Sequence, residues 1–403
     1  MKVGLLNPIA PENIGGGYTY EHEIFDRIRE LAPISGHEFV VFDESDDDES
    51  AGPTRHAVER MSLTRRIWSN VRKAIKASPA RKGGYRWGSK SIREKLVSEG
   101  VEFFINVSPE LAILDVPFLA IVWDLQHRLQ PFFPEVGSGD IWQMREKFYS
   151  QVIKRAAFVT TGTKAGKEEI QRFYGIAEER VRLLPHPTPR FALEDGIADF
   201  AEVAKYKVPP GYIFYPAQFW SHKNHVGLLR AVAHLKRREN LCLPVVLTGS
   251  DQGNEAYVRQ MVEDLQLREQ VYFLGHVPRT TLRALYQHAF VLGYLSFFGP
   301  DNLPPLEAFA LGCPVIAADV PGANEQLGDA AVLVNPAHEL EIAQALRSLF
   351  HDHAKRESLI QRGKERAHRY TSEDFVKGLF ALLDEFQTIR QCWPASPQLP
   401  LSA

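Results

Sequence analysis

The sequence alternates short apolar runs with longer stretches of helical periodicity, and it does so twice along the chain. In the first half, the apolar runs predict strands at 2–7, 38–43, 103–107, 118–123 and 158–161. In the second half, they predict strands at 212–215, 244–249, 271–274, 289–294, 314–317 and 331–334. Continuously apolar strands separated by helices are typical of parallel sheets covered on both faces. The pattern therefore predicts an α/β protein with two doubly wound, Rossmann-like domains.

A proline-rich stretch, Leu184–Arg190, separates the two series of strands, because prolines interrupt both helices and central strands. A chain of 403 residues predicts two to three domains, at roughly 150 residues per domain. The helix near the C-terminus is expected to have Ser372 as its N-cap. The assignments are 1–188 for the N-terminal domain, 205–371 for the C-terminal domain, about 185–210 for a hinge-like linker, about 372–392 for the last helix and 393–403 for a disordered tail.

Composition excludes several classes of protein. The chain has 47 basic and 50 acidic side chains, a near-neutral balance that argues against a protein that coats nucleic acid. Its three cysteines exclude a disulfide scaffold and fit a reducing cytoplasm. No apolar run approaches the ~20 residues of a membrane span, and the N-terminus reads as a buried strand, not a signal peptide. Attachment to a membrane surface stays open.

Two segments stand out by charge. The acidic run at 43–50 contains an Asp-x-Asp, which could hold a nucleotide-bound metal, but such runs are usually solvated loops. Between Arg55 and Lys95 there are thirteen Lys or Arg, interleaved with apolar and aromatic residues. This segment could be an amphipathic helix for an anionic membrane face or an anionic acceptor. The alternatives are a plain surface helix and, least favoured, a nucleic-acid contact.

The stretch from Ser296 to Ile316 carries the most chemical information. A strand leads into a Gly/Pro/Asp/Asn loop, and a helix then starts with prolines and ends at Gly312. The free N–H groups at the start of such a helix form an anion site suited to a phosphate. Glu307, about one turn into the helix, is well placed to accept hydrogen bonds from a ribose diol. The alternative is a glutamate that only stabilises the helix start.

A second stretch, Tyr215–His225, follows a strand and precedes a helix. Lys223 is expected at the carboxyl end of the sheet, where it could neutralise a diphosphate, although a lone lysine there is often merely solvated. His222 and His225 lack a third ligand type nearby, so no metal site is expected.

In the first half, the loop Gly15-Gly16-Gly17-Tyr18 follows the first predicted strand and allows close approach of a ligand to the backbone. It matches neither the dinucleotide fingerprint nor a P-loop, and Gly162–Lys167 is not a P-loop either. Asp124 and His127 follow another strand and are expected to face the cleft between the domains. The alternative is a loop aspartate and a surface histidine.

Taken together, these stretches resemble glycosyltransferase family 4, whose members are retaining enzymes of the GT-B fold. The resemblance covers nearly the whole chain and depends on the order of its motifs. Those motifs are the Gly15–Gly17 loop, Asp124-Leu125, Thr163 at a helix start, Lys223, Leu303–Ala308 with Gly312–Ile316, Pro321–Glu325 and Leu333–Pro336. The run from Pro216 to His225 resembles a branch that builds bacterial polysaccharides with mannose or rhamnose.

Three positions depart from the family pattern. The first of the family's two glutamates, which usually contacts the donor sugar, is Gly299, with Asp301 nearby but out of register. The arginine often found five residues before the lysine is Gln218. The histidine of the family's His-Asp-Leu is Trp123, with His127 as a candidate substitute.

The resemblance implies a GT-B fold in which the last helix crosses back to the first domain. It implies a sugar-nucleotide donor bound in the second domain without an obligatory metal or cofactor. Lys223 and the helix start would stabilise the departing diphosphate, Glu307 would hold the ribose, and the acceptor would be a glycan or a lipid-linked sugar. The implied site residues are Lys223, Asp124 and His127 for catalysis; Glu307, Gln218, Asp301, Asn302, Leu303, Gly249, His276 and Val277 for the donor; and Gly15, Gly16, Gly17 and Tyr18 for the acceptor.

The leading hypothesis is a retaining hexosyltransferase of cell-surface polysaccharide synthesis, such as O-antigen, in the cytoplasm or at the inner membrane face. One alternative is a sugar-nucleotide epimerase of the same fold. Another is a non-catalytic relative that binds a sugar nucleotide, an alternative that Gly299 motivates.

Overall fold

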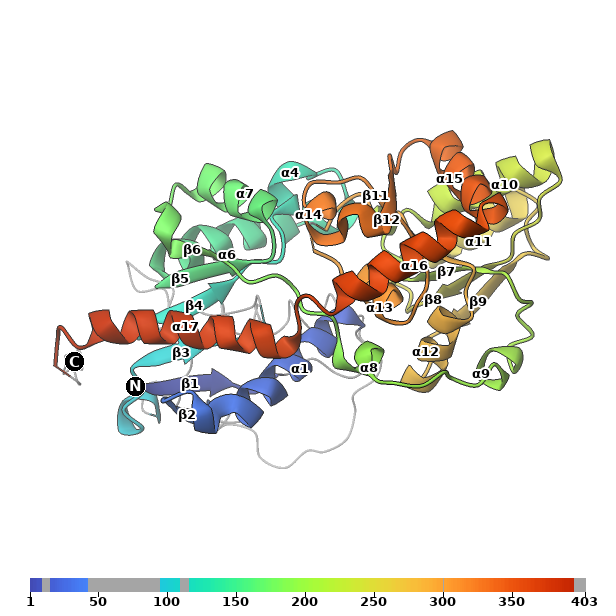
Figure 1. Ribbon diagram of the computed structural model, residues 1–403. Coiled ribbons are helices and arrows are strands. Elements are labelled where there is room, and N and C mark those ends of the chain that lie inside the picture. Colours follow the sequence, from blue (N-terminus) through green and yellow to red (C-terminus); the bar gives the residue numbers. More distant parts are fainter. Residues whose placement is uncertain (9–14, 43–94, 109–115, 300, 395–403) are drawn as a thin grey trace, which may run out of the picture.

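The computed structural model describes residues 1–8, 15–42, 95–108, 116–299 and 301–394. Two lobes are visible in Figure 1, each built on a six-stranded parallel sheet with helices on its faces. The acidic run at 43–50 and the basic segment, except for its last residue Lys95, lie outside the described residues. The membrane-surface prediction that depends on that segment therefore stays a prediction.

The first lobe contains the strands of the first predicted series. Its sheet has the order β2-β1-β3-β4-β5-β6, and every neighbouring pair is parallel. The strands are β1 (Lys2–Leu6), β2 (Glu38–Phe42), β3 (Phe103–Ile105), β4 (Phe118–Ile121), β5 (Phe158–Thr161) and β6 (Val181–Leu183). The helices are α1 (Gly16–Leu31), η1 (Ala32–Ile34), α4 (Gln126–Leu129), α5 (Pro134–Gly137), α6 (Ile141–Arg155), α7 (Lys164–Tyr174) and η3 (Glu178–Arg180).

The second lobe repeats the plan with the strand order β12-β11-β10-β7-β8-β9. Its strands are β7 (Ile213–Pro216), β8 (Val245–Thr248), β9 (Val271–Gly275), β10 (Val291–Tyr294), β11 (Val315–Ala318) and β12 (Ala331–Val334). Its helices are α8 (Arg190–Leu193), α9 (Ala201–Ala204), η4 (Ser221–Lys223), α10 (His225–Glu239), α11 (Glu255–Asp264), α12 (Arg279–Gln287), α13 (Leu303–Ala310), α14 (Ala323–Leu327), η5 (Gly328–Ala330), α15 (Glu339–His351) and α16 (His353–Ala367). The predicted fold class is confirmed.

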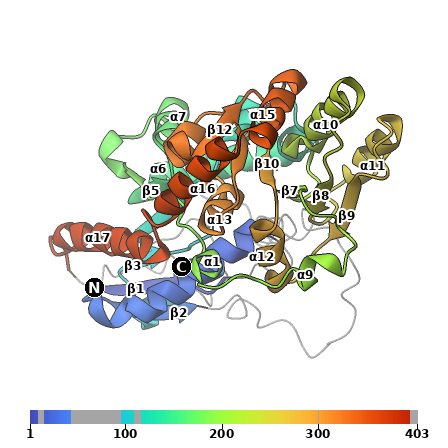
Figure 2. The same ribbon diagram turned by 45° about the vertical axis from the view of Figure 1, so that its right-hand side comes forward.

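The last helix, α17 (Ser372–Arg390), leaves the second lobe and lies along the first, as Figures 1 and 2 show from two directions. Its buried face packs Phe375 against Tyr20 of α1 and Phe386 against Phe103 of β3. The expected N-cap at Ser372 is wrong, because Thr371 caps the helix. The Thr371 side chain accepts from the Asp374 backbone N–H, and the Asp374 carboxylate accepts from that of Thr371, a capping box. Among the helices of the described ranges, none is both long and apolar enough to cross a membrane.

The two crossings between the lobes lie side by side. Thr188, on the way out, donates its N–H to the Tyr370 carbonyl at 3.1 Å and forms a parallel bridge with Thr371, on the way back. Phe191 and Val203 are buried in the core of the second lobe, so that lobe already begins within the stretch predicted to be the linker.

The strand order places a ligand site at a defined edge of the second sheet. Its order reverses between the adjacent strands β7 and β10, so the chain leaves their carboxyl ends in opposite directions. In open α/β sheets, ligands bind in the crevice at such a switch point. The loop after β7 leads to Lys223, and the loop after β10 leads to the start of α13.

Candidate functional site

The two loops at the switch point of the second sheet are tied to each other. Asn224 has a left-handed backbone (φ 53°), and its side chain accepts from the Gly227 N–H at 3.1 Å to cap α10. The same side chain donates to the Leu295 carbonyl at 3.2 Å, directly after β10. The Phe297 N–H in turn donates to the His222 carbonyl at 2.8 Å. The loops after β7 and β10 therefore form one unit.

Lys223 points toward the start of α13. Its Nζ donates to the Tyr294 hydroxyl at 2.9 Å, and that hydroxyl donates to Oδ1 of Asn302 at 3.1 Å. Asn302 is the N-cap residue of α13, and the helix has proline in its first turn. An ammonium group and the positive end of a helix dipole thus lie together, an arrangement that favours a phosphate, although Pro304 and Pro305 carry no N–H and the Asn302 N–H already donates to Gln326.

The loop before α13 explains why position 299 carries no glutamate. Gly299 has φ 113°, in the region that disfavours residues with a side chain. A Cβ atom there would lie 2.7 Å from Oδ1 of Asn302, and the Asn302 side chain donates to the Gly299 carbonyl at 2.6 Å. The backbone conformation that places Asn302 therefore requires glycine at this position.

Glu307, in α13, is 6% exposed, and its side chain faces Tyr286 of α12. The Tyr286 hydroxyl donates to its Oε2 at 2.5 Å, while Oε1 has no hydrogen-bond partner among the described residues. Burial raises the pKa of Glu307 to about 7, although the Tyr286 hydrogen bond and the Arg279 charge act in the opposite direction. One carboxylate oxygen is therefore held in place, and the other is left for a ligand.

The raised pKa of Glu307 predicts a pH dependence of stability. The folded state binds this proton more tightly than the unfolded state, so the free energy of unfolding falls as the pH rises from about 4.5 to about 7. For a fully buried group the loss amounts to at most about 3 kcal/mol. We expect Glu307→Gln to lose less stability than the wild type between pH 5 and pH 8 in urea unfolding. Because Glu21 and Glu169 also have pKa values raised to about 7, the informative quantity is the difference between the two proteins. Equal losses would exclude a buried, titrating Glu307.

Other residues predicted to bind the donor lie around the same edge. Gly249 follows β8, and a Cβ atom there would lie 2.4 Å from the Ala217 carbonyl oxygen, so only glycine fits. Gln218 is held on both sides, since it donates to Ser250 and accepts from Trp220, each at 3.0 Å. After β9, His276 is exposed and Val277 is buried.

Asp301 and Leu303 lie against the first lobe. The Asp301 carboxylate is 4% exposed and accepts from the His186 N–H at 3.1 Å, in the first crossing. Burial raises its pKa, and the neighbouring His186 opposes that shift. A Cβ atom on Gly16 would lie 3.6 Å from Leu303, so the start of α1 faces the start of α13. Gly15 caps α1 with φ 82°, and Tyr18 lies in its first turn.

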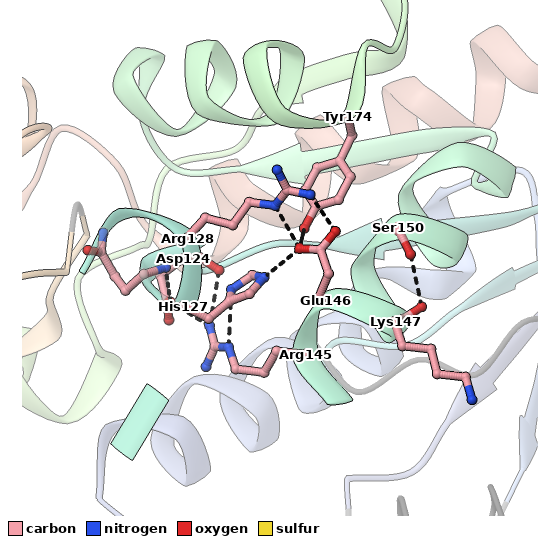
Figure 3. Close-up of polar contacts among 9 residues, drawn as sticks. Asp124, His127, Arg128, Arg145, Glu146, Lys147, Ser150 and Tyr174 are labelled. Atoms are coloured by element: carbon pink, nitrogen blue, oxygen red, sulfur yellow. Dashed lines mark hydrogen bonds and ion pairs between the residues drawn. The ribbon is translucent and has the colours of Figure 1, made fainter. Parts of the chain in front are cut away.

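At the carboxyl end of β4, Asp124 is held in a polar network (Figure 3). Arg145 of α6 donates to Oδ1 of Asp124 at 2.5 Å, and the Gln126 N–H donates to the same oxygen at 2.9 Å. Although burial raises the pKa of Asp124, the Arg145 guanidinium outweighs it and the net pKa is lowered. Asp124 is therefore an ionised carboxylate of fixed orientation.

His127 does not face the cleft as expected. Its ring is fully buried and stacks on Tyr149 at 5.6 Å. Arg145 donates to its Nδ1 at 3.4 Å, so the proton is on Nε2, which lies 3.3 Å from Glu146 (Figure 3). Burial, and then the Arg145 charge, lower the pKa of His127 to about 4. The ring is a neutral bridge between α4 and α6, which no substrate reaches in this conformation.

No metal site was expected at His222 and His225, and the neighbours of these two side chains are aromatic rings and one carboxylate. His225 is stacked between Tyr215 and Phe219, with ring centroids at 4.8 and 4.6 Å. His222 contacts Glu135 of the first lobe. Within the described ranges, no group of three His, Cys, Asp or Glu could hold a metal ion.

Several residues at the site were missed by sequence reasoning. Tyr294 and Tyr286 orient Lys223 and Glu307, and Arg145 orients Asp124. These residues lie on separate elements and form no motif along the chain. A histidine or carboxylate next to a motif can be recognised in the sequence as a candidate site residue. A partner that comes from another helix or strand cannot be recognised in this way.

Comparison with known proteins finds a family model that resembles the second lobe. Residues 199–366 match the model of the family described as glycosyl transferases group 1. The chain is 28% identical over 224 residues to the O-antigen chain mannosyltransferase RfbU of Salmonella typhimurium, covering 55% of this chain and 59% of the relative. It is 26% identical over 243 residues to the O-antigen chain mannosyltransferase B of Escherichia coli, covering 60% and 64%. The matched part thus spans less than two thirds of either relative.

Solved structures resemble the whole chain. Sucrose-phosphate synthase from Thermosynechococcus elongatus superposes with a TM-score of 0.72 at 17% identity, over 96% of this chain and 99% of that one. HepE of Anabaena, solved in complex with UDP and glucose, gives 0.66 at 14% identity, over 96% and 100%. The chain therefore has the GT-B fold, and its residues 199–366 match the family model of the group 1 glycosyl transferases.

Proposed function

We propose that the protein is a retaining glycosyltransferase of family 4 that uses a sugar nucleotide as donor. The observation that carries this proposal is the meeting of Lys223 with the start of α13 at the switch point of the second sheet. A fixed ammonium group and a helix start stabilise the charge that grows on a departing diphosphate, and they do so without a metal ion.

The remaining residues complete a donor site around that point. The free Oε1 of Glu307 would accept hydrogen bonds from the ribose hydroxyls, because the Tyr286 hydroxyl already holds Oε2. The backbone around His276 and Val277 would contact the base of the nucleotide. Gly249, which lies close to Ala217, would line the bottom of the nucleotide site. HepE, which has the same fold, binds UDP, so a nucleoside diphosphate is a reasonable ligand here.

The acceptor would enter from the first lobe, between the start of α1 and the ionised Asp124. In the proposed step, the bond between the sugar C1 and the diphosphate oxygen breaks, and a bond from the acceptor oxygen to C1 forms on the same face. The acceptor proton passes to the departing phosphate, so no carboxylate nucleophile is needed. His127 would act indirectly by holding α4 beside Asp124, since its ring is buried.

The sugar and the acceptor are proposed from the relatives. Both O-antigen mannosyltransferases match much of this chain, so we propose transfer of mannose, or of a related hexose or deoxyhexose such as rhamnose. The acceptor would be a glycan or a lipid-linked sugar in cell-surface polysaccharide synthesis. The reaction would take place in the cytoplasm, at the inner membrane face if the basic segment binds anionic lipid.

A ligand screen by calorimetry and thermal shift tests the donor site. UDP, GDP and dTDP and their sugars are compared, and we expect one diphosphate to stabilise the protein. At a hundredfold excess over Kd, a ligand that binds only the folded state adds roughly 2.7 kcal/mol of stability. The stabilising sugar nucleotide should then be hydrolysed slowly without acceptor. Conversion of the sugar without release would identify an epimerase, binding without either reaction would identify a non-catalytic relative, and no binding would refute the donor site.

A further inference from the structure

A short segment of the first lobe contacts both loops at the proposed donor site, the loop after β7 and the loop after β10. We call residues 130–135, between α4 and the start of α5, the clamp segment. Its Gln130 side chain donates to the Phe297 carbonyl at 3.0 Å, in the loop after β10. Its Phe133 ring lies 5.5 Å from Phe298 in the same loop. Its Glu135 carboxylate reaches the turn η4, in the loop after β7.

The contact between Glu135 and His222 is the central one. Oε1 of Glu135 accepts from the His222 backbone N–H at 2.8 Å and also contacts Nδ1 of the ring. At the start of a short helical turn, such an N–H has no partner within the turn itself. The first lobe therefore supplies the hydrogen bond that η4 cannot make internally, and Lys223 is the next residue of that turn.

Because the contact between Glu135 and His222 is buried, its loss is expected to destabilise the turn η4. The side chains of Glu135 and His222 are 7% and 9% exposed. Burial raises the pKa of Glu135, but its hydrogen bonds with His222 outweigh that effect and lower the net pKa, so the carboxylate is ionised. Burial, and then the Lys223 charge, lower the pKa of His222 to about 4, so its ring is neutral and Nδ1 donates. Removing the carboxylate would leave two buried donors without a partner.

The ring of His222 extends the contact to the second loop. It stacks on Phe298 with the ring centroids 3.8 Å apart and 12° between the planes. The His222 carbonyl accepts from the Phe297 N–H. Displacement of η4 would therefore disturb the loop after β10 as well, and with it the approach of the chain to α13.

The clamp segment is itself anchored in the first lobe. Arg128 of α4 donates to Glu146 of α6 through Nε at 2.6 Å, and Asp124 pairs with Arg145 of the same helix (Figure 3). The network seen at Asp124 thus fixes α4, which leads directly into the clamp segment. A displacement of the first lobe would therefore be passed through this segment to the turn that holds Lys223.

We propose that Glu135 is a positioning residue that places Lys223 for the reaction only when the two lobes are closed. The inference rests on the proposed function, because Lys223 matters for turnover only if the chain transfers a sugar. It couples the acceptor lobe to the donor's leaving group, so that donor cleavage without closure is suppressed.

The first test is hydrogen exchange of the backbone amides of His222 and Phe297, which needs no substrate. We expect Glu135→Ala to speed exchange at both amides at least tenfold. Glu135→Gln should keep most of the protection, because its amide oxygen can still accept from the His222 N–H. Unchanged exchange in Glu135→Ala would overturn the proposal. Should circular dichroism show that the alanine variant does not fold, Glu135→Asp takes its place, because its shorter side chain withdraws the carboxylate from the His222 N–H, and the same acceleration is expected.

The matched control is Glu325→Ala, which removes another contact between the lobes. Glu325 accepts from the N–H groups of Lys164 and Ala165 at 2.7 and 3.0 Å, on helices that do not carry Lys223. We expect it to leave the exchange of His222 unchanged. An equal acceleration in this variant would show that only general closure protects the turn, and would overturn the assignment of Glu135.

Kinetics with the donor found in the ligand screen complete the test. We expect Glu135→Ala to lower kcat about tenfold while the donor KM changes less than threefold, because the charge on the diphosphate grows toward the transition state. A change in KM alone would contradict the positioning role. If no donor is turned over by the wild type, the proposed function fails, whereas the exchange data still decide whether Glu135 holds the turn.

Discussion

Lys223→Ala is expected to lower turnover of the sugar nucleotide about a hundredfold or more, the loss typical of one preorganised stabilising group. Its ammonium group is held by the Tyr294 hydroxyl at 2.9 Å, beside the start of α13. The alanine variant therefore removes positive charge where the departing diphosphate would be stabilised.

The measurement is kcat and KM for donor hydrolysis and for transfer, with nucleoside diphosphate affinity measured separately by calorimetry. Lys223→Arg keeps the charge with a different shape and should recover part of the rate. Lys236→Ala is the control, since that lysine lies in α10 and donates to the Gln266 carbonyl on the surface. A rate within threefold of the wild type in Lys223→Ala would remove Lys223 from the mechanism.

Tyr294→Phe offers a finer comparison at the same place. The hydroxyl both accepts from Lys223 and donates to Asn302, so its loss frees the ammonium group without removing it. A rate between those of the wild type and Lys223→Ala would show that the orientation of the charge matters as well as its presence.

The strands and the fold could be predicted from the sequence because buried parallel strands leave continuous apolar runs. Strand β6 escaped prediction for the same physical reason. It lies at the sheet edge, Arg182 is at its centre and Leu183 is exposed, so it has no apolar run. The N-cap of α17 was placed one residue late because Thr371 and Ser372 are both good capping residues, and only the capping box with Asp374 distinguishes them.

The site could be predicted only where its residues are neighbours along the chain. Lys223, Asn302 and Glu307 belong to two short stretches that follow strands, and the parallel order of the sheet brings those strand ends together. Orientation could not be predicted, because it depends on partners from other helices. His127 was expected in the cleft, yet Arg145 and Glu146 of α6 turn its ring inward.

The loop conformation explains why Gly299 stands where the family pattern has a glutamate, and this conformation could not be seen in the sequence. The left-handed backbone there and the hydrogen bond from Asn302 to its carbonyl belong to one loop conformation. A glutamate at this position would have to displace Asn302, which receives the hydrogen bond from Tyr294. The loop thus has a fixed approach to α13 at the position where the family resemblance implies an acid that contacts the sugar. Donor binding, as proposed, would then depend more heavily on the remaining contacts of Lys223 and Glu307.

Glu307→Ala is accordingly expected to lower kcat/KM for the sugar nucleotide about a hundredfold or more. The variant loses the free Oε1 proposed for the ribose and leaves the buried Tyr286 hydroxyl without its acceptor. Because an unpartnered buried group also destabilises the fold by roughly 1–3 kcal/mol, rates must be measured well below the melting temperature.

Two matched variants separate the ribose contact from the damage to the fold. Tyr286→Phe removes only the hydroxyl that holds Oε2, so it should cost much less activity than Glu307→Ala. The double variant Glu307→Ala/Tyr286→Phe removes both buried partners and should recover stability without recovering the rate. Equal losses in Tyr286→Phe and Glu307→Ala, or recovery of the rate in the double variant, would show that Glu307 supports α12 and α13 and does not bind the donor. A hundredfold loss confined to variants without the carboxylate would place the nucleoside beside Glu307, one helical turn from the diphosphate held by Lys223.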